Sequence, residues 1–252
     1  KVFIAENVKG ILSANKGLAI ETIIKDFRSL EPGYLVIPKL IDFSCYGLPQ
    51  IRERVLIFGI RKDTQFDMLF PGTTHGEGKL TPTSSHKGIE NIKKDVLNQE
   101  HMNIQPRTIE ILKRIPPGGN FASIDKQDPY YVKGMISHVY RRLDPDKPAK
   151  TIIAAGGGGT WGYHYPEPRA LTNRERARLQ GFPDNFNFEG TFGEIRKQIG
   201  NAVPPIGTIN FVNSISKLFR KNYKTCDLEK IDNLVSKMSI KDLMKSSNSK
   251  IE

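Results

Sequence analysis

One run of six apolar residues constrains the fold of this chain more than any other feature. Residues 55–60 read Val-Leu-Ile-Phe-Gly-Ile, without the polar alternation of a strand that has one face in water. A short run of this kind is typical of a strand covered by helices on both sides. It therefore predicts an α/β architecture built around a buried sheet.

The segments before this run extend the same pattern. Residues 1–5 and 34–43 are rich in Val, Ile and Phe, which favours strands, and residues 18–27 carry apolar side chains at helical spacing. We interpret residues 1–61 as the second half of a parallel, doubly wound sheet that closes with an antiparallel hairpin.

The chain changes character after this sheet. Residues 62–168 combine Gly and Pro clusters with short β-prone segments, which predicts a small, loop-rich and mostly β domain. Thr172 and Glu175 have the spacing of a capping box, so regular helix is expected to return in residues 169–221.

Residues 222–252 are rich in Lys and Ser. They predict a solvated, basic C-terminal tail with one weak helix around residues 228–244. Because the chain opens on Lys1 in a strand-like segment, we expect it to be a piece of a longer protein.

The overall charge favours a polyanionic partner. The chain has 38 Lys and Arg against 27 Asp and Glu, a net charge of +11, which favours nucleic acid. Its two distant cysteines supply neither a disulfide framework nor a CxxC metal site, and its histidines lack ligand spacing. No apolar run reaches the roughly 18 residues of a membrane span. We expect an intracellular protein with no membrane partner.

The segment from Gln50 to Arg54 carries the most local chemistry. Alternate side chains of a strand share a face, so Gln50, Arg52 and Arg54 are expected side by side. Two guanidinium groups and an amide suit phosphate oxygens and the carbonyl edge of a base. A charged edge strand that resists aggregation is the alternative.

Two further positions suit a ligand. Glu6 follows the first strand at its carboxyl end, where open α/β sheets bind their ligands. Taken alone, it is read more simply as an exposed residue at a strand end. Residues 198–205 join a Gly-containing loop to a helix, where backbone groups can approach a small ligand.

Five strings then occur in a fixed order along the chain. They are Glu6-Asn7-Val8, Tyr46-Gly47-Leu48-Pro49-Gln50-Ile51-Arg52-Glu53-Arg54, Arg169-Ala170-Leu171-Thr172, Arg178-Leu179-Gln180-Gly181-Phe182-Pro183 and Gln198-Ile199-Gly200-Asn201-Ala202-Val203-Pro204. In this order they resemble motifs VI to X of the DNA cytosine-5 methyltransferases, over residues 1 to about 219.

The resemblance implies the C-terminal part of such an enzyme. Residues 1–61 would then be the second half of its Rossmann-like catalytic sheet, and residues 62–168 its target recognition domain. Residues 169–221 would return to the catalytic domain, ahead of the basic tail at 222–252.

The resemblance also implies roles for single residues. In this family a cysteine attacks carbon 6 of a flipped cytosine, and carbon 5 receives the methyl group of S-adenosylmethionine. Glu6 matches the glutamate that binds the cytosine ring nitrogen and amino group, and Arg54 matches the arginine at the carbonyl oxygen. Arg52 is expected to position a phosphate or Glu6. Asn201 and Val203 match residues that line the methionine end of the cofactor.

Contacts to duplex DNA are expected around a further segment that resembles the family. Residues 148–152 are similar to the Thr-Ile signature of the recognition domain, and the glycine run at 156–159 is interpreted as a loop near DNA. The residues expected to contact DNA are Gln50, Arg141, Arg142, Lys147, Lys150 and Thr151. A solvated basic face is the alternative.

The family's glycine-rich cofactor loop, acidic ribose clamp and Pro-Cys nucleophile have no counterpart in this sequence. Neither Cys45 nor Cys226 follows a proline. We therefore expect the isolated chain to be inactive, and to methylate DNA only with the missing N-terminal half, in the same chain or as a separate subunit.

The expected function is the modification arm of a restriction-modification system in the bacterial cytoplasm. A non-catalytic DNA-binding specificity module is the first alternative. A tRNA cytosine-5 methyltransferase is the second.

Overall fold

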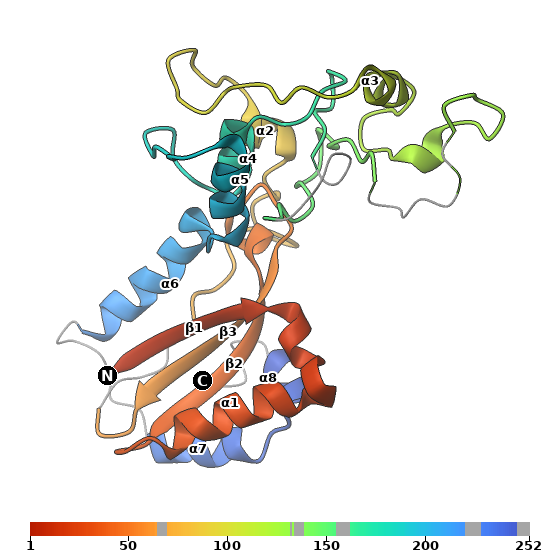
Figure 1. Ribbon diagram of the computed structural model, residues 1–252. Coiled ribbons are helices and arrows are strands. Elements are labelled where there is room, and N and C mark those ends of the chain that lie inside the picture. The colour runs from red at the N-terminus through yellow and green to blue at the C-terminus, as the bar shows by residue number, and fades with distance from the viewer. Residues whose placement is uncertain (65–69, 132, 134–138, 155–161, 220–227, 246–252) are drawn as a thin grey trace. The chain divides into compact units, whose positions relative to one another are not determined.

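The computed structural model describes residues 1–64, 70–131, 133, 139–154, 162–219 and 228–245 (Figure 1). The chain divides into two compact units. The sheet unit comprises Lys1–Asp42, Glu53–Thr73 and Thr208–Glu252, and the loop unit comprises Phe43–Arg52 and Thr74–Gly207. The four domain segments expected from the sequence stay predictions.

The sheet unit contains three strands, β1 (Val2–Val8), β2 (Tyr34–Asp42) and β3 (Glu53–Arg61). Their order is β1-β3-β2, and both pairings are antiparallel. The predicted strands and the closing β2–β3 hairpin are confirmed. The predicted parallel pairing is not seen among the described strands, because β3 inserts between β1 and β2.

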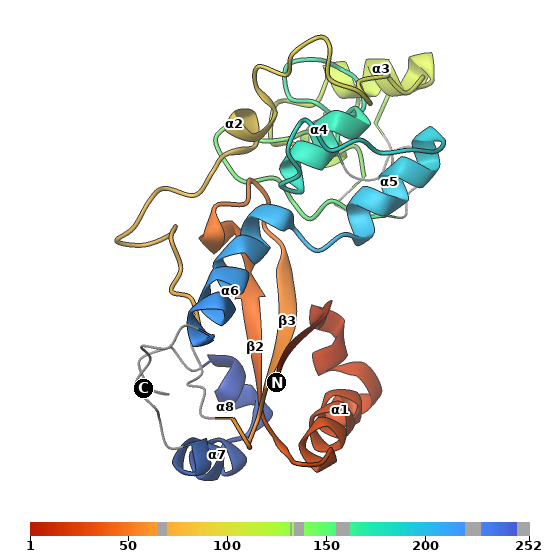
Figure 2. The ribbon, with the colours of Figure 1, turned by 90° about the vertical axis from the view of Figure 1, so that its left-hand side faces the viewer.

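Helices cover both faces of this sheet, as the apolar run at residues 55–60 predicts (Figure 2). The short 3-10 turns η1 (Lys9–Leu12) and η2 (Ala14–Gly17) lead into α1 (Leu18–Ser29). Ile20 and Ile24 of α1 pack on Val36 and Ile57. On the opposite face the ring of Phe211, from α6 (Pro205–Leu218), lies 5.8 Å from that of Phe58.

The prediction of helix around residues 228–244 is confirmed, although two helices form there in place of one, α7 (Leu228–Ser236) and α8 (Ile240–Lys245). The prediction that this segment is solvated is wrong for its apolar side chains. Ile231, Val235 and Met238 pack with Leu35 and Ile37 of β2. Their spacing of four and three residues makes one apolar helical face, which the many Lys and Ser residues of the segment conceal.

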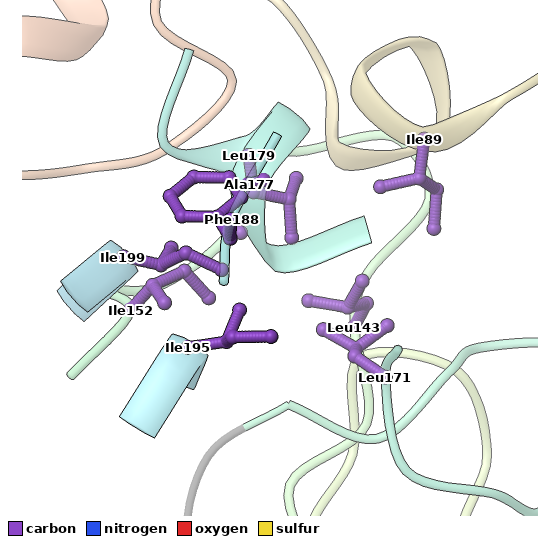
Figure 3. Packing of buried hydrophobic residues seen from close by; sticks show 10 residues of the cluster. Ile89, Leu143, Ile152, Leu171, Ala177, Leu179, Phe188, Ile195 and Ile199 are labelled. Carbon is purple, nitrogen blue, oxygen red and sulfur yellow. The ribbon is translucent and has the colours of Figure 1, made fainter. Parts of the chain in front are cut away.

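The loop unit contains four α-helices among its described residues. They are α2 (Ser85–Ile89), α3 (Pro106–Lys113), α4 (Asn173–Leu179) and α5 (Phe192–Asn201), with 3-10 turns η3 (Phe43–Tyr46) and η4 (Phe121–Ser123). Its largest apolar cluster gathers Ile152, Leu179, Phe188, Ile195 and Ile199 with five further residues (Figure 3).

The prediction of a mostly β domain at residues 62–168 is wrong for the described residues. They form isolated bridges, such as Arg142 to Tyr163, and no extended strand. Pro145 and Pro148 lack the N–H donor that a β ladder requires, so pairing stops after one or two residues. The glycine run at 156–159 lies outside the described residues.

The predicted capping box of α4 is confirmed. Thr172 Oγ1 accepts a hydrogen bond from the Glu175 N–H at 3.1 Å, and the Glu175 carboxylate accepts one from the Thr172 N–H at 2.8 Å. None of the described helices is both long and apolar enough to cross a membrane.

A glycine in β3 makes room for an aromatic ring of β1. Phe3 lies opposite Gly59 in the register, and a Cβ added at Gly59 would lie 2.0 Å from the Phe3 ring. We expect Gly59→Ala to lower the free energy of unfolding by about 1–3 kcal/mol through overpacking, measured by urea denaturation. Gly10→Ala is the control, since its added Cβ meets only Val8, at 3.9 Å. Equal stability of the two variants would contradict this packing.

Candidate functional site

The structure brings together Glu6 and Arg54, two of the residues expected to act on a base. The register pairs Glu6 with Leu56 and Arg54 with Val8, so the two side chains are diagonal neighbours on one face of the β1–β3 pair. Arg54 Nε lies 2.8 Å from Glu6 Oε1. Arg54 also donates to the carbonyl oxygen of Glu53 at 2.8 Å, which fixes the plane of its guanidinium group.

This pair is sheltered but accessible. The exposed fractions of the side chains are 12% for Arg54 and 25% for Glu6. Burial lowers the pKa of Arg54, and the neighbouring charge of Glu6 opposes that shift by favouring the cation. The pair therefore offers a carboxylate acceptor and a guanidinium donor side by side at a partly open surface.

Gln50 lies in the loop unit and is fully buried. Its amide donates to the carbonyl oxygen of Leu179 at 3.0 Å and to the side chain of Gln180 at 2.9 Å. Its side-chain oxygen accepts from the Ile152 N–H at 2.8 Å. The expected DNA contact of Gln50 is therefore corrected, because these protein groups occupy an amide that is shielded from solvent.

Arg52 is also buried in the loop unit, with 2% of its surface exposed. Its guanidinium donates to the carbonyl oxygens of Ile152 at 3.0 Å, Gly200 at 2.9 Å and Ala202 at 3.2 Å. Arg52 therefore binds backbone carbonyl oxygens, whereas the sequence predicts that it positions a phosphate or Glu6. The alternation argument does not apply to Gln50 and Arg52, because β3 begins only at Glu53.

Arg142 needs the same correction. It is buried and donates to the carbonyl oxygens of His164 at 3.0 Å, Leu112 at 3.1 Å and Ile115 at 2.7 Å, and also to that of Tyr165. Burial lowers the pKa of this guanidinium. The side chain cross-links loops of the protein in place of the expected DNA contact.

The other residues expected to contact DNA share one pocket, which we call the basic pocket. Arg141, Lys147, Lys150 and Thr151 line it, together with the buried Arg142, and its volume is about 250 Å³. Lys147 is exposed and pairs with Asp144 at 3.0 Å. Thr151 Oγ1 donates to the Ile51 carbonyl oxygen at 2.8 Å, which fixes this side of the pocket.

Asn201 is the last residue of α5, Val203 lies between α5 and α6, and both are exposed. We call residues 200–203, the end of α5 and the two residues after it, the α5–α6 loop. Its Gly200 and Ala202 carbonyl oxygens are bound by Arg52. The loop thus exposes an amide and an apolar side chain.

Sequence reasoning gave no role to Gln180, although this residue lies in one of the five strings. Its side-chain amide donates to the Ala202 carbonyl oxygen at 2.6 Å. The signal that could have found Gln180 is an amide side chain at a position where the sequence pattern indicates burial. A buried polar side chain needs hydrogen-bond partners within the protein.

The acidic and basic residues around α4 form ion pairs within the loop unit. Arg169 contacts Glu175 at 2.8 Å, and Arg178 contacts Asp184 at 2.5 Å. Burial raises the pKa of Glu175, but the hydrogen bond and charge of Arg169 outweigh it, so this pKa lies below its usual value. These residues brace the loop unit.

Cys45 is half-buried. Cys226 lies outside the described residues. Within the described part of the chain, no group of three or more His, Cys, Asp and Glu side chains is arranged to hold a metal ion.

Comparison with known proteins places this chain in a family. The model of the family of C-5 cytosine-specific DNA methylases matches residues 1–217. The chain is 55% identical over 232 residues to the type II methyltransferase M.NgoFVII of Neisseria gonorrhoeae, a match that covers 90% of this chain and 62% of that protein. It is 46% identical over 224 residues to the type II methyltransferase M.BbvI of Brevibacillus brevis, which covers 87% of this chain and 59% of that protein.

The fold has a counterpart among solved structures. An Escherichia coli protein encoded within a prophage and described as a DNA modification methyltransferase superimposes with a TM-score of 0.59 at 20% sequence identity, over 86% of this chain and 69% of that chain. The chain spans about three fifths of the length of the two relatives above, at 62% and 59%. It belongs to the family of C-5 cytosine-specific DNA methylases.

Proposed function

We propose that the complete enzyme containing this chain methylates carbon 5 of cytosine in a specific duplex DNA sequence, as the modification arm of a restriction-modification system. The observation that carries this proposal is the Glu6–Arg54 pair at 2.8 Å, formed by the two residues that the resemblance assigns to the base. S-adenosylmethionine, which the family uses, supplies an electrophilic methyl group when bound.

The pair matches the hydrogen-bonding edge of cytosine. The Glu6 carboxylate accepts from the exocyclic amino group, and the Arg54 guanidinium donates to the carbonyl oxygen. Both side chains are partly shielded, which strengthens such contacts relative to water. The positive charge of Arg54 also stabilises electron density that moves onto the ring during the reaction.

The α5–α6 loop would bind the methionine end of the cofactor. Asn201 offers amide hydrogen bonds and Val203, 42% exposed, offers apolar contact. Arg52 holds the neighbouring carbonyl oxygens at 2.9 and 3.2 Å, so the loop is shaped before a ligand arrives.

The basic pocket would bind a DNA phosphate. Arg141, Lys147 and Lys150 surround one concave surface, and a clustered positive charge attracts the backbone irrespective of sequence.

A further part of the proposal is that an N-terminal half completes the catalytic domain and brings the cysteine nucleophile. Among the described strands β1 pairs only with β3, so its other edge offers free backbone groups (Figure 1). Helix α6 exposes Ile206, Ile209 and Val212, three residues apart on one face. The length relative to M.NgoFVII, 62%, agrees with a substantial missing part.

Complementation tests this division of labour and separates it from a DNA-binding module without chemistry. We expect no 5-methylcytosine when this chain alone is incubated with duplex DNA and labelled S-adenosylmethionine, and label in DNA after the N-terminal half is added. Label from the chain alone would contradict the assignment of the nucleophile. DNA binding without label in the mixture would favour the module, and label in tRNA would favour the tRNA enzyme.

Glu6→Gln tests the catalytic pair in the complete enzyme. We expect kcat to fall by about 100-fold or more while the Kd for DNA changes little, because Glu6 acts chiefly as charge develops on the base. Single-turnover methylation and a DNA-binding titration measure the two quantities.

The control for this variant is Glu53→Gln, on the adjacent strand. Glu53 is 42% exposed and pairs with Lys9 at 2.9 Å. Equal losses of kcat and of DNA affinity in Glu6→Gln, or an equal loss of kcat in Glu53→Gln, would contradict the role of Glu6.

Lys150→Ala tests the basic pocket through salt dependence. If Lys150 contacts one phosphate, the slope of log K against log salt concentration should become shallower by about one. Lys25→Ala, at an exposed position of α1, is the control and should leave the slope unchanged. The same slope in wild type and Lys150→Ala would place this lysine away from the DNA.

A further inference from the structure

We propose that Arg52 is a positioning residue that couples cofactor binding to DNA binding, by joining the α5–α6 loop to the wall of the basic pocket. The inference rests on the proposed function, since it assigns these two surfaces to S-adenosylmethionine and DNA. It adds a mechanical link between them that neither surface requires alone.

One planar group holds both segments. Arg52 Nη1 donates to the Ile152 carbonyl oxygen at 3.0 Å, and Nη2 donates to those of Gly200 at 2.9 Å and Ala202 at 3.2 Å. The guanidinium donors have fixed relative directions. A shift of either segment alone would therefore break a hydrogen bond to a buried cation, which is costly.

Two glutamines close this link into a ring of hydrogen bonds. Gln50 accepts from the Ile152 N–H at 2.8 Å and donates to the Gln180 side chain at 2.9 Å. Gln180 donates to the Ala202 carbonyl oxygen at 2.6 Å, which Arg52 also binds. Both polar backbone groups of Ile152 are thus engaged, and the ring leads back to Arg52 through its carbonyl oxygen.

The two segments are also in direct contact. A Cβ added at Gly200 would lie 2.2 Å from the Ala154 nitrogen and 2.4 Å from the Ile153 carbonyl carbon. There is no space for the loop to slide past residues 153–154 without disturbing them. Close packing and the hydrogen-bond ring make a single stiff block.

The residues proposed to contact the ligands lie next to the hydrogen-bonded residues in both segments. Lys150 and Thr151 directly precede Ile152 and line the basic pocket. Asn201 and Val203 flank Ala202 and are exposed. DNA that shifts the first segment therefore shifts the second with it, and a cofactor that shifts the second segment does the same to the first, because coupling is reciprocal.

Calorimetry with S-adenosylhomocysteine tests the coupling in the complete enzyme, with and without a duplex oligonucleotide that it methylates. For the wild type we expect the Kd for S-adenosylhomocysteine to fall at least about fivefold when DNA is present. In Arg52→Lys we expect less than about a twofold change, because a lysine ammonium cannot span three carbonyl oxygens in one plane.

Arg174→Lys is the matched control. Arg174 is also buried and also donates to three carbonyl oxygens, those of Leu97 at 2.9 Å, Pro183 at 3.2 Å and Phe186 at 2.9 Å, but it touches neither segment through these bonds. We expect this variant to lose thermal stability and to keep the wild-type coupling. A structural role of Arg52 alone would lower stability in both variants without changing the coupling.

Gln180→Met provides a second route if Arg52→Lys does not fold. It removes one of the two donors to the Ala202 carbonyl oxygen and leaves Arg52 in place. We therefore expect the logarithm of the DNA-induced change in Kd for S-adenosylhomocysteine to fall by about half or more. Wild-type coupling in both network variants overturns the inference. A wild type that methylates DNA without coupling overturns the inference and leaves the proposed function intact. If the wild type binds neither S-adenosylhomocysteine nor DNA, both the inference and the proposed function are contradicted.

Discussion

The hydrogen bonds from buried guanidinium groups to backbone carbonyl oxygens are the interaction on which the loop unit depends. Arg52, Arg142 and Arg174 each bind at least three carbonyl oxygens, which belong in each case to two separate segments of the chain. The described residues of this unit form isolated bridges and no extended sheet, so their carbonyl oxygens lack ladder partners. Buried carbonyl groups need a donor, and the arginines provide it while joining the two segments to each other.

This arrangement weakens the argument from net charge to a polyanionic partner. The charge of +11 favours a polyanionic partner, but part of it belongs to arginines that serve the interior. Around the basic pocket, fewer Lys and Arg side chains are available at the surface than the net charge suggests. One of them, Lys147, is paired with Asp144 at 3.0 Å. Local geometry, more than total charge, therefore carries the argument for DNA.

The sequence was sufficient to predict elements in which a local side-chain pattern indicates the backbone structure directly. The apolar run at 55–60 predicted a strand covered on both faces, and Thr172 with Glu175 predicted the start of α4; both are found. It was insufficient for Gln50 and Arg52, because a guanidinium or an amide suits a phosphate and a backbone carbonyl equally well. Only the tertiary fold decides which acceptor is present, and the strand boundary at Glu53 separates them from Arg54.

The central claim is that Arg52 makes one stiff block of residues 149–154 and 199–203. Hydrogen–deuterium exchange followed by mass spectrometry, on wild type and Arg52→Lys, tests it most directly. We predict that both segments lose amide protection together in the variant, while α3, which Arg52 does not contact through the bonds described, keeps its protection. Loss of protection in only one segment, or in neither, would contradict the account.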